Sequence, residues 1–362
     1  MENGLENVVA AETVLSDVDG ARGRLVLRGH SLDDLRGWPF EAVLALLLEG
    51  FFDDIPAGAA LSSALGLART RVFAHVKAAD AALLALPPSE AVRALLARLK
   101  DGEDLQDALD LVAAPAVFTP AIVRLRRGEA AIAPDAGLSH SADVLRMLRG
   151  QTPDPAVAQA LDSYLVTVAD HGLNASTFAA RVVASTRAGL TSSVLAGLSA
   201  LIGPLHGGAP GPVLDALDGI GEPANAEAWL EQSLLRGERL MGFGHRVYRV
   251  RDPRADALKA AVRSMAAAGA IAPARLALAE AVEAAALAIL KRRKPDRPLE
   301  TNVEFYTALL LEALGFPRDA FTAVFAMGRT AGWLAHAREQ ALGGRLIRPQ
   351  SRYVGPGVPV AA

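Results

Sequence analysis

The sequence predicts an all-α protein, almost wholly helical apart from one short β-hairpin near its N-terminus. Three observations support this fold class. Apolar residues recur at three- and four-residue spacing, alanine enrichment raises helix propensity, and no alternation of strands with helices follows the hairpin, as a parallel sheet would require. At about 150 residues per domain, the 362 residues predict two domains, or one large domain with an insertion.

The first predicted element is the hairpin. Residues 14–18 and 24–27 flank the turn pair Asp19-Gly20. Further along, the apolar spacing predicts helices that include residues 161–168 and 280–291. We expect prolines to separate short helices at Pro87-Pro88, Pro115, Pro120, Pro153 and Pro155.

The strongest interruption is the Gly/Pro-rich segment 203–212, which we expect to be a hinge. The larger helical domain would comprise residues 1–210 and 317–362, and the smaller helical domain residues 211–316. The uncharged stretch 188–205 is nearly long enough to span a bilayer, but it is rich in Gly and Ser and lacks aromatic anchors. We therefore expect it to form a helix that is buried on all sides.

Composition excludes several classes of protein. Hydrophobic residues make up 51% of the chain and charged residues 21%, so a substantial core can form and disorder is excluded. With a net charge of −3, the chain lacks the positive field of a nucleic-acid-binding protein. The absence of cysteine removes disulfides, thiolate metal sites and cysteine nucleophiles. The acidic N-terminus shows no export signal, so we expect a soluble, cytoplasmic protein with no nucleic-acid or membrane partner.

Segment 242–254 is the first candidate site. Asp252 fits an N-cap and Pro253 the first position of a helix that continues to Met265. Arg254 then lies in the first turn, where the positive end of the helix dipole disfavours a cation by a few tenths of a kcal/mol unless an anion is nearby. The alternative interpretation is a solvated basic turn.

Two histidines lie in loops next to predicted helices. His206 stands between Pro204-Leu205 and a glycine pair, where it could donate a hydrogen bond or act as a general acid or base. A structural histidine bonded to a carbonyl group explains this position equally well. His171 precedes a helix start for which the possible caps are Asn174, Ser176 and Thr177. By itself, His171 carries no functional signal.

The last candidates lie in two C-terminal helices. Thr301 and Glu304 match a capping box, although a carboxylate in an apolar first turn could also be a general base. In the helix predicted over 321–342, Arg329 shares one face with apolar residues, so it needs a carboxylate from an internal Glu or from a ligand. His336, on the same helix, is expected to be structural or supporting.

Together these features predict a pocket with several histidines, one carboxylate and several arginines. Such a pocket can hold a small polycarboxylate and move a proton near it. The competing interpretation is a zinc site made of His171, His206 and His245. No pair of these histidines has short metal-ligand spacing, and the arginines would be left unexplained.

The chain resembles citrate synthase, and most closely the shorter bacterial branch of that family. The resemblance covers nearly the whole chain and is carried by segments 203–208, 242–254 and 302–306, the last together with 321–329. It implies large and small helical domains that close over the substrates, and a homodimer. It also implies an acyltransferase that condenses acetyl-CoA with oxaloacetate and hydrolyses the product to citrate and CoA, without a metal or other cofactor.

The resemblance further implies three catalytic residues. His206 would hydrogen-bond the thioester oxygen as the enol or enolate forms, Glu304 would remove the methyl proton, and His245 would polarise the oxaloacetate ketone. Since a thioester methyl is a poor acid, a base alone is insufficient, and a donor must stabilise the charge that develops on the oxygen.

The implied binding residues are one histidine and four arginines. Arg254 and Arg329 would hold carboxylates, His171 would be another oxaloacetate contact, and Arg348 would reach the site of the neighbouring subunit. Arg249 resembles a position that contacts CoA phosphate.

The sequence leaves alternatives and departs from the family pattern in two places. 2-Methylcitrate synthase uses propionyl-CoA through the same groups, and one methylene is worth only about 1–3 kcal/mol in a pocket. A silent family member that binds CoA or a carboxylate as a regulator is a further alternative, which the intact catalytic set disfavours. Glu304 stands where many members have aspartate, and Gly172 stands where an acidic residue is common.

Overall fold

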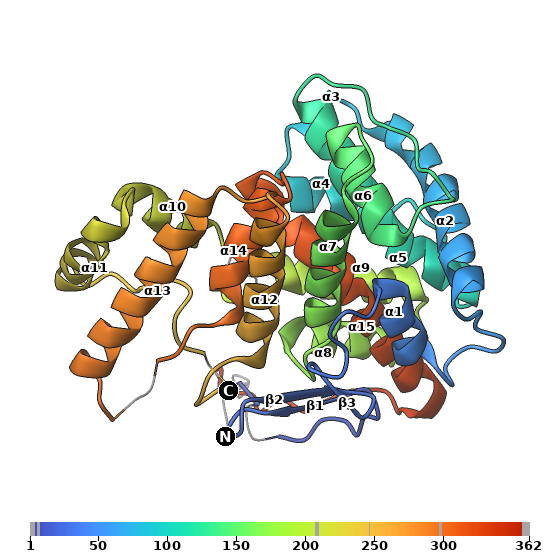
Figure 1. Ribbon diagram of the computed structural model, residues 1–362. Helices are drawn as coiled ribbons and strands as arrows, with labels where there is room; N and C mark the ends of the chain where they lie inside the picture. The colour runs from blue at the N-terminus through green and yellow to red at the C-terminus, as the bar shows by residue number, and fades with distance from the viewer. Residues whose placement is uncertain (1–3, 6–7, 207–209, 246, 297–298, 357–362) are drawn as a thin grey trace.

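The N-terminal sheet of the computed structural model is antiparallel. The structure describes residues 4–5, 8–206, 210–245, 247–296 and 299–356. Strand β1 (Ser16–Asp19) pairs with β2 (Arg24–Leu27), and β2 pairs with β3 (His30–Ser31), in the order β1-β2-β3. The predicted hairpin is confirmed, and a third short strand extends it. Figure 1 shows the sheet beneath the helices, on the side where both termini lie.

Helices hold 60% of the residues and strands 3%, which confirms the all-α prediction. The α-helices are α1 Phe40–Leu48, α2 Ala59–Phe73, α3 Ala81–Leu84, α4 Pro88–Leu96, α5 Leu105–Arg126, α6 His140–Arg149, α7 Pro155–Val168, α8 Ala175–Ala184, α9 Leu190–Ile202, α10 Gly211–Ile220, α11 Ala226–Leu235, α12 Pro253–Ala267, α13 Pro273–Arg293, α14 Val303–Ala313 and α15 Phe321–Gly343. Short 3₁₀ turns are η1 Ala74–Ala78, η2 Pro223–Asn225 and η3 Arg318–Ala320.

The prediction that Pro115 and Pro120 break the chain was wrong, because both lie inside the single helix α5. Every residue from Leu111 to Val123 is buried, and α5 packs against α2, α4, α6 and α15. This burial offsets the hydrogen bonds that the two prolines remove. Among the described residues, α5 is also the one helix long and apolar enough to cross a membrane, but 83% of that stretch is buried inside the protein. The remaining predicted prolines do flank helices, and Pro88 and Pro155 open α4 and α7.

The stretch 188–205 forms the shorter helix α9. The expectation that this helix is buried on all sides was wrong. Its side toward α8 is buried, whereas Ser199 is exposed and Leu195 is only half-buried. Gly203 ends the helix, and Leu205 beyond it is 101% exposed. The sequence pattern could not distinguish a helix with one open face from a fully buried one, because small residues occupy both faces.

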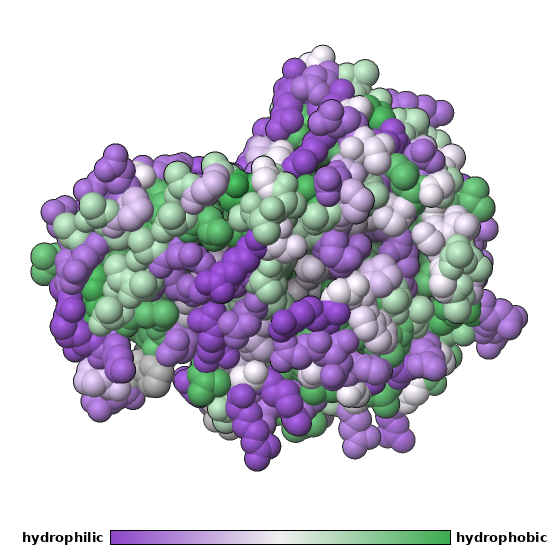
Figure 2. Space-filling model, in the orientation of Figure 1, coloured by the Kyte–Doolittle hydropathy of each residue, from purple (hydrophilic) through white to green (hydrophobic). Residues whose placement is uncertain are grey.

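Five helix ends or surfaces meet where the site forms. In Figure 1, α12 lies between α14 and α7, and α15 passes behind α7 and α8. Glycines let α15 approach α7 closely: a Cβ on Gly328 would lie 2.6 Å from Val168 Cγ2, and one on Gly332 would lie 2.3 Å from the Ala169 carbonyl oxygen. Helices α10, α11 and α13 extend to the left in Figure 1, and Figure 2 shows hydrophobic and hydrophilic residues interspersed over both parts of this face. The domain boundaries at 210/211 and 316/317 stay a prediction.

Candidate active site

The loop that carries His171 joins α7 to α8. Of the three predicted caps, Asn174 is the one used, since its Oδ1 accepts hydrogen bonds from the backbone N–H groups of Ser176 and Thr177, both at 3.1 Å. Gly172 has a φ of +63°, and a Cβ there would lie 3.2 Å from Val18 Cγ2. This left-handed, crowded position favours glycine over a residue with a side chain.

One face of α15 fixes the start of this loop. Arg329 Nε donates to the Val168 carbonyl oxygen at 2.7 Å, and the Gly332 N–H donates to the Ala169 carbonyl oxygen at 3.1 Å. One turn further along, His336 Nε2 lies 3.2 Å from Asp170 Oδ2. Residues 329, 332 and 336 share one face by their spacing, so a single helix surface sets the path of the chain before His171.

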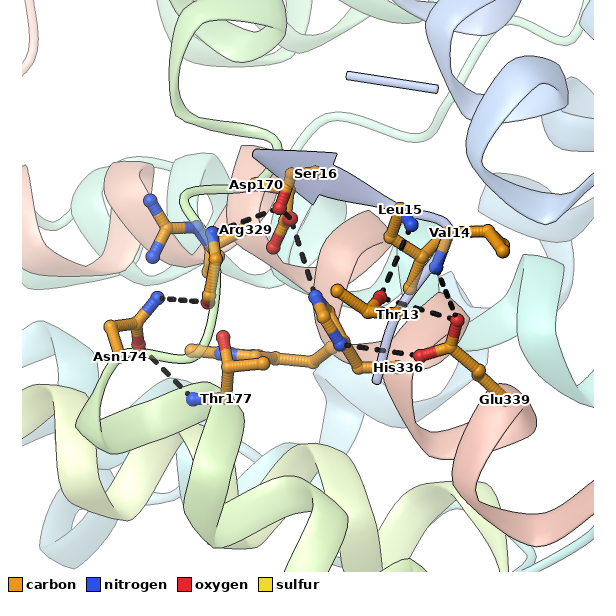
Figure 3. A network of polar contacts seen from close by, with 12 residues as sticks. Thr13, Val14, Leu15, Ser16, Asp170, Asn174, Thr177, Arg329, His336 and Glu339 are labelled. Atoms are coloured by element: carbon orange, nitrogen blue, oxygen red, sulfur yellow. Dashed lines mark hydrogen bonds and ion pairs between the residues drawn. The ribbon is translucent and has the colours of Figure 1, made fainter. Parts of the chain in front are cut away.

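The two ring nitrogens of His336 have different neighbours, and Figure 3 shows the ring between Asp170 and Glu339. Its Nδ1 lies 3.0 Å from Arg181 Nη1, which can only donate, so Nδ1 accepts and Nε2 carries the proton that is donated to Asp170. Burial would raise the pKa of Asp170, but His336 and nearby Arg329 outweigh burial and lower it. His336 therefore has a supporting role, as expected.

Three rings from two segments form the centre of the site. His171 Nε2 lies 3.0 Å from the Tyr248 hydroxyl. The ring centroid of His245 lies 5.9 Å from that of His171 and 4.9 Å from that of Tyr248. Burial, and then the charges of Arg254 and Arg329, lower the pKa of His171 well below its usual value, so its ring is neutral.

His245 is held in one tautomer. The backbone N–H groups of Val247 and Tyr248 donate to His245 Nδ1 at 3.0 and 3.1 Å, so the proton of the neutral ring is on Nε2. Burial, and then the charge of Arg254, lower the pKa of His245 to about 4. Nε2 lies 3.1 Å from Arg254 Nη2, so two donors point to one place. An oxygen acceptor between them would satisfy both.

Arg254 is not part of a solvated basic turn, because it is 5% exposed. Its Nε and Nη2 donate to the two carboxylate oxygens of Asp252 at 3.0 and 2.9 Å. Burial would lower the pKa of Arg254, but Asp252 outweighs burial and raises it. Asp252 caps α12 as predicted and also accepts the Val303 N–H at 3.2 Å, which joins the starts of α12 and α14.

The capping box predicted for Thr301 and Glu304 was wrong. Asn302 is the N-cap, and its Oδ1 accepts the Glu304 N–H at 3.0 Å. Thr301 Oγ1 instead donates to Glu283 Oε1 at 2.7 Å. Asn302 also donates through Nδ2 to the Gly244 carbonyl oxygen at 2.8 Å, so this cap joins α14 to the loop that carries His245.

Glu304 therefore lies in the first turn of α14, and its carboxylate takes no part in capping the helix. Within the described part of the chain, its carboxylate makes no hydrogen bond. Burial raises the pKa of Glu304 to about 7, although the charge of Arg254 opposes the shift. A carboxylate with this pKa can accept a proton near neutral pH and also release it.

Arg329, on α15, is a second buried cation whose charge acts on the histidines. It is 2% exposed, its guanidinium carbon lies 4.8 Å from the Phe325 ring centroid, and burial lowers its pKa to about 10, so it remains charged. Arg254 and Arg329 each lower the pKa of His171, and Arg329 also lowers that of His206. Two buried cations and three histidines thus converge on one small volume.

His206 contacts the start of α8. Its Nε2 lies 2.8 Å from Ser176 Oγ, which accepts a hydrogen bond from Trp333 Nε1 at 3.1 Å. The hydroxyl proton of Ser176 is available to His206 or to Asn174 Oδ1, which lies 2.7 Å away. Burial, and then Arg329, lower the pKa of His206, which favours the neutral ring.

The structure does not bring every predicted residue into this volume. Arg249 and Arg348 are exposed, the former beside the Tyr248 loop and the latter in the C-terminal segment. Residues 207–209 of the predicted hinge lie outside the described residues. Over the ranges that the structure describes, no three His, Asp or Glu side chains are grouped to hold a metal, so the zinc interpretation gains no support.

Sequence reasoning missed the residues that orient the histidines. Tyr248 lies in a segment that the sequence singles out but had no expected role, and Ser176 and Asp252 were expected only as helix caps. The separation of Ser176 from His206 by 30 positions left no local signal for their contact. A carboxylate two positions before Arg254 was the one available hint of an internal partner.

Comparisons with known proteins agree with this fold. The family model for the citrate synthase C-terminal domain matches residues 4–350. Citrate synthase from Haloferax volcanii is 36% identical over 372 residues, covering 98% of this chain and 96% of that protein. 2-Methylcitrate synthase from Mycobacterium tuberculosis is 36% identical over 370 residues, covering 98% and 91%.

A solved structure shows the same fold. It is the ternary complex of citrate synthase from Thermoplasma acidophilum with carboxymethyl coenzyme A and oxaloacetate, at 27% identity, a TM-score of 0.84, and coverage of 99% of this chain and 97% of that one. Fold, site and relatives define an enzyme that is an acyltransferase. The chain belongs to the citrate synthase family.

Proposed function

We propose that this enzyme condenses acetyl-CoA with oxaloacetate and hydrolyses the resulting thioester to citrate and free CoA. The proposal rests on one observation above the others. Glu304 is a half-buried carboxylate with a pKa of about 7, and the charge of Arg254 acts on it. Its N-cap, Asn302, is hydrogen-bonded to the loop that carries neutral His245. A base, a neutral donor and a cation are thus gathered at one place.

The first step is removal of a methyl proton from acetyl-CoA. Glu304 accepts that proton while His206 donates a hydrogen bond to the thioester oxygen, where negative charge develops. When Ser176 donates its hydroxyl proton to His206 Nε2, the ring proton is on Nδ1 and available to the substrate. The neutral state of His206 is favoured by burial, which lowers its pKa.

The second step is attack of the enol carbon on the ketone of oxaloacetate. The ketone oxygen would accept from His245 Nε2, and Arg254 Nη2 beside it would hold the adjacent carboxylate. Arg329 would bind the other carboxylate, and His171 would contact the substrate from the side of α7. Water would then attack the thioester carbon, and CoA would leave as the thiol. In this scheme, the base, the hydrogen-bond donors and the cations are all side chains of the protein.

Two predicted arginines act outside this centre in the proposal. Arg249 would contact a CoA phosphate, and Arg348 would reach the site of a neighbouring subunit in a homodimer. An apolar surface beside α8 and α9 supports an interface between two copies, since Leu173 and Leu205 are 40% and 101% exposed.

The acyl group is tested by measuring thiol release with oxaloacetate and either acetyl-CoA or propionyl-CoA. We expect a higher kcat/KM with acetyl-CoA. The relative named 2-methylcitrate synthase is as similar as the one named citrate synthase, at 36% identity each, so preference for propionyl-CoA is the alternative outcome. No release with either substrate from folded protein would favour a regulator that binds CoA or a carboxylate.

A further inference from the structure

The N-terminal strand β1 contacts the loop that carries His171. Ser16 Oγ accepts the Gly172 N–H at 3.0 Å and donates to Asp170 Oδ2. Figure 3 shows Ser16 and Asp170 side by side, with His336 on the other side of the carboxylate. Two residues along the same strand, Val18 packs against Gly172. Both neighbours of His171 in sequence are therefore fixed by β1.

The turn at the other end of β1 contacts the loop that carries His245. The Gly20 carbonyl oxygen accepts the Arg249 N–H at 2.8 Å. A Cβ on Gly20 would lie 2.3 Å from the Val247 carbonyl oxygen, which is closer than real Cβ contacts. Asp19 fixes the turn, because its Oδ1 accepts the N–H groups of Ala21 and Arg22 at 3.1 and 3.0 Å.

These contacts act on the peptide groups that orient the site. The Val247 carbonyl and the Tyr248 N–H belong to one planar peptide unit, so the carbonyl cannot move without the N–H. That N–H donates to His245 Nδ1 at 3.1 Å. The next unit contains the Arg249 N–H that Gly20 accepts. Gly20 thus touches both peptide units of Tyr248, whose hydroxyl contacts His171.

We propose that Ser16 and Gly20 are positioning residues for substrate binding. Through the short strand between them, they set the separation and orientation of His171 and His245. The effect on oxaloacetate rests on the proposed function, whereas the effect on the His245 tautomer does not. Glycine is required at position 20 by this close approach and not by an unusual backbone angle, because its φ is not positive.

The test is Gly20→Ala against Gly343→Ala, since a Cβ added at Gly343 would have no atom within 4 Å and the φ there is not positive. We expect Gly20→Ala to raise the KM for oxaloacetate about 10-fold or more, because a shift near 1 Å at a reacting group is costly. Both variants should remain folded, with a single cooperative unfolding transition. Equal oxaloacetate KM values in the two variants of an active enzyme would overturn the proposal.

A spectroscopic measurement separates this inference from the proposed function. In ¹⁵N NMR spectra of the histidine rings, His245 should be the Nε2–H tautomer in the wild type and in Gly343→Ala. Gly20→Ala should show loss of that single tautomer, even if the wild type releases no thiol. An unchanged His245 signal in Gly20→Ala would overturn the proposal, whereas an inactive wild type would overturn only the function.

Ser16 provides a second test, which also applies if Gly20→Ala does not fold. Ser16→Ala removes the acceptor of the Gly172 N–H and the donor to Asp170, whereas Ser16→Thr keeps a hydroxyl. We expect the KM for oxaloacetate to rise several-fold in Ser16→Ala and to return toward wild type in Ser16→Thr. The role of Ser16 is refuted if both variants keep the wild-type KM for oxaloacetate, or if their KM values are equal to each other.

Discussion

Two histidines of this protein, buried His140 and half-buried His245, have opposite surroundings. His140, at the start of α6, is 0% exposed, and neither ring nitrogen has a hydrogen-bond partner in the described part of the chain. His245 Nδ1 accepts hydrogen bonds from two backbone N–H groups, and its protonated Nε2 lies 3.1 Å from Arg254 Nη2, which is also a donor. Burial lowers the pKa of both, to about 4 for His245 and well below the usual value for His140.

The difference shows that burial and a shifted pKa do not by themselves mark a reactive histidine. The ring of His140 packs 5.2 Å from that of Phe40, and its neighbour Arg69 is neutralised by Asp143 at 2.8 Å. Around His245, by contrast, two donors, its Nε2 and Arg254 Nη2, lie 3.1 Å apart and point to a common place. What marks the site is this convergence of oriented donors with a basic carboxylate, Glu304, beside them.

The largest effect is expected from removing that carboxylate. Glu304→Gln keeps the shape of the side chain but cannot accept the proton, so kcat should fall about 10³-fold while oxaloacetate binding is retained. Thiol release and calorimetric titration with oxaloacetate measure the two. Glu103→Gln, at an exposed loop position, makes the same chemical change and should leave both unchanged. Turnover above a tenth of wild type in Glu304→Gln would contradict the assignment.

A smaller effect is expected at the buried cation. Arg329→Lys keeps the charge but loses the planar fork that bonds to Val168 and faces the site. The KM for oxaloacetate should rise about 10- to 100-fold, as expected for hydrogen bonds to a charged group. Exposed Arg98→Lys serves as the control. A change confined to the KM for acetyl-CoA would contradict the assignment of Arg329 to oxaloacetate binding.

The pH profile sharpens the contrast between Glu304 and His245. Because burial raises the pKa of Glu304 to about 7, its carboxylate form is lost as the pH falls below 7. We expect kcat/KM to drop about 10-fold per pH unit on that side. His245, with a pKa of about 4, should add no limb between about pH 5.5 and 8.5. A flat wild-type profile over this range would rule out Glu304 as a base with a raised pKa.

The smallest effect on activity is expected at His140. Folded His140 stays neutral, whereas the unfolded chain binds a proton below pH 6.5, so stability falls as the pH drops through that value. His140→Leu should remove the part of this loss that His140 causes, about 1.4 kcal/mol between about pH 7.5 and 5.5, and leave kcat/KM unchanged. Urea unfolding at the two pH values measures it. An unaltered pH dependence would show that His140 does not contribute.

Local patterns were sufficient to predict part of the fold. Asp19-Gly20 predicted the hairpin, and Asp252-Pro253 predicted the start of α12 because a cap and a proline act within one turn. Thr301 failed as a cap because Glu283 takes its hydroxyl from another helix, a contact that spans 18 positions. The prolines of α5 failed as breaks because tertiary burial outweighs their local cost.

For the site, too, local patterns predicted one part and tertiary contacts decided the rest. The motifs of the sequence contained His171, His206, His245, Arg254 and Glu304, and the structure places them together. Their orientation could not be predicted, because it depends on distant contacts such as that between His336 and Asp170, 166 positions apart. The sequence names the groups that can react, whereas tertiary hydrogen bonds decide which nitrogen of each histidine carries the proton.

The most direct test of the proposed site is oxaloacetate-dependent release of CoA thiol from acetyl-CoA, measured side by side for the wild type, His140→Leu and His245→Ala. We predict equal release by the wild type and His140→Leu, and loss of release by folded His245→Ala. Wild-type protein that is folded but inactive, or His245→Ala that is as active as His140→Leu, would contradict this prediction.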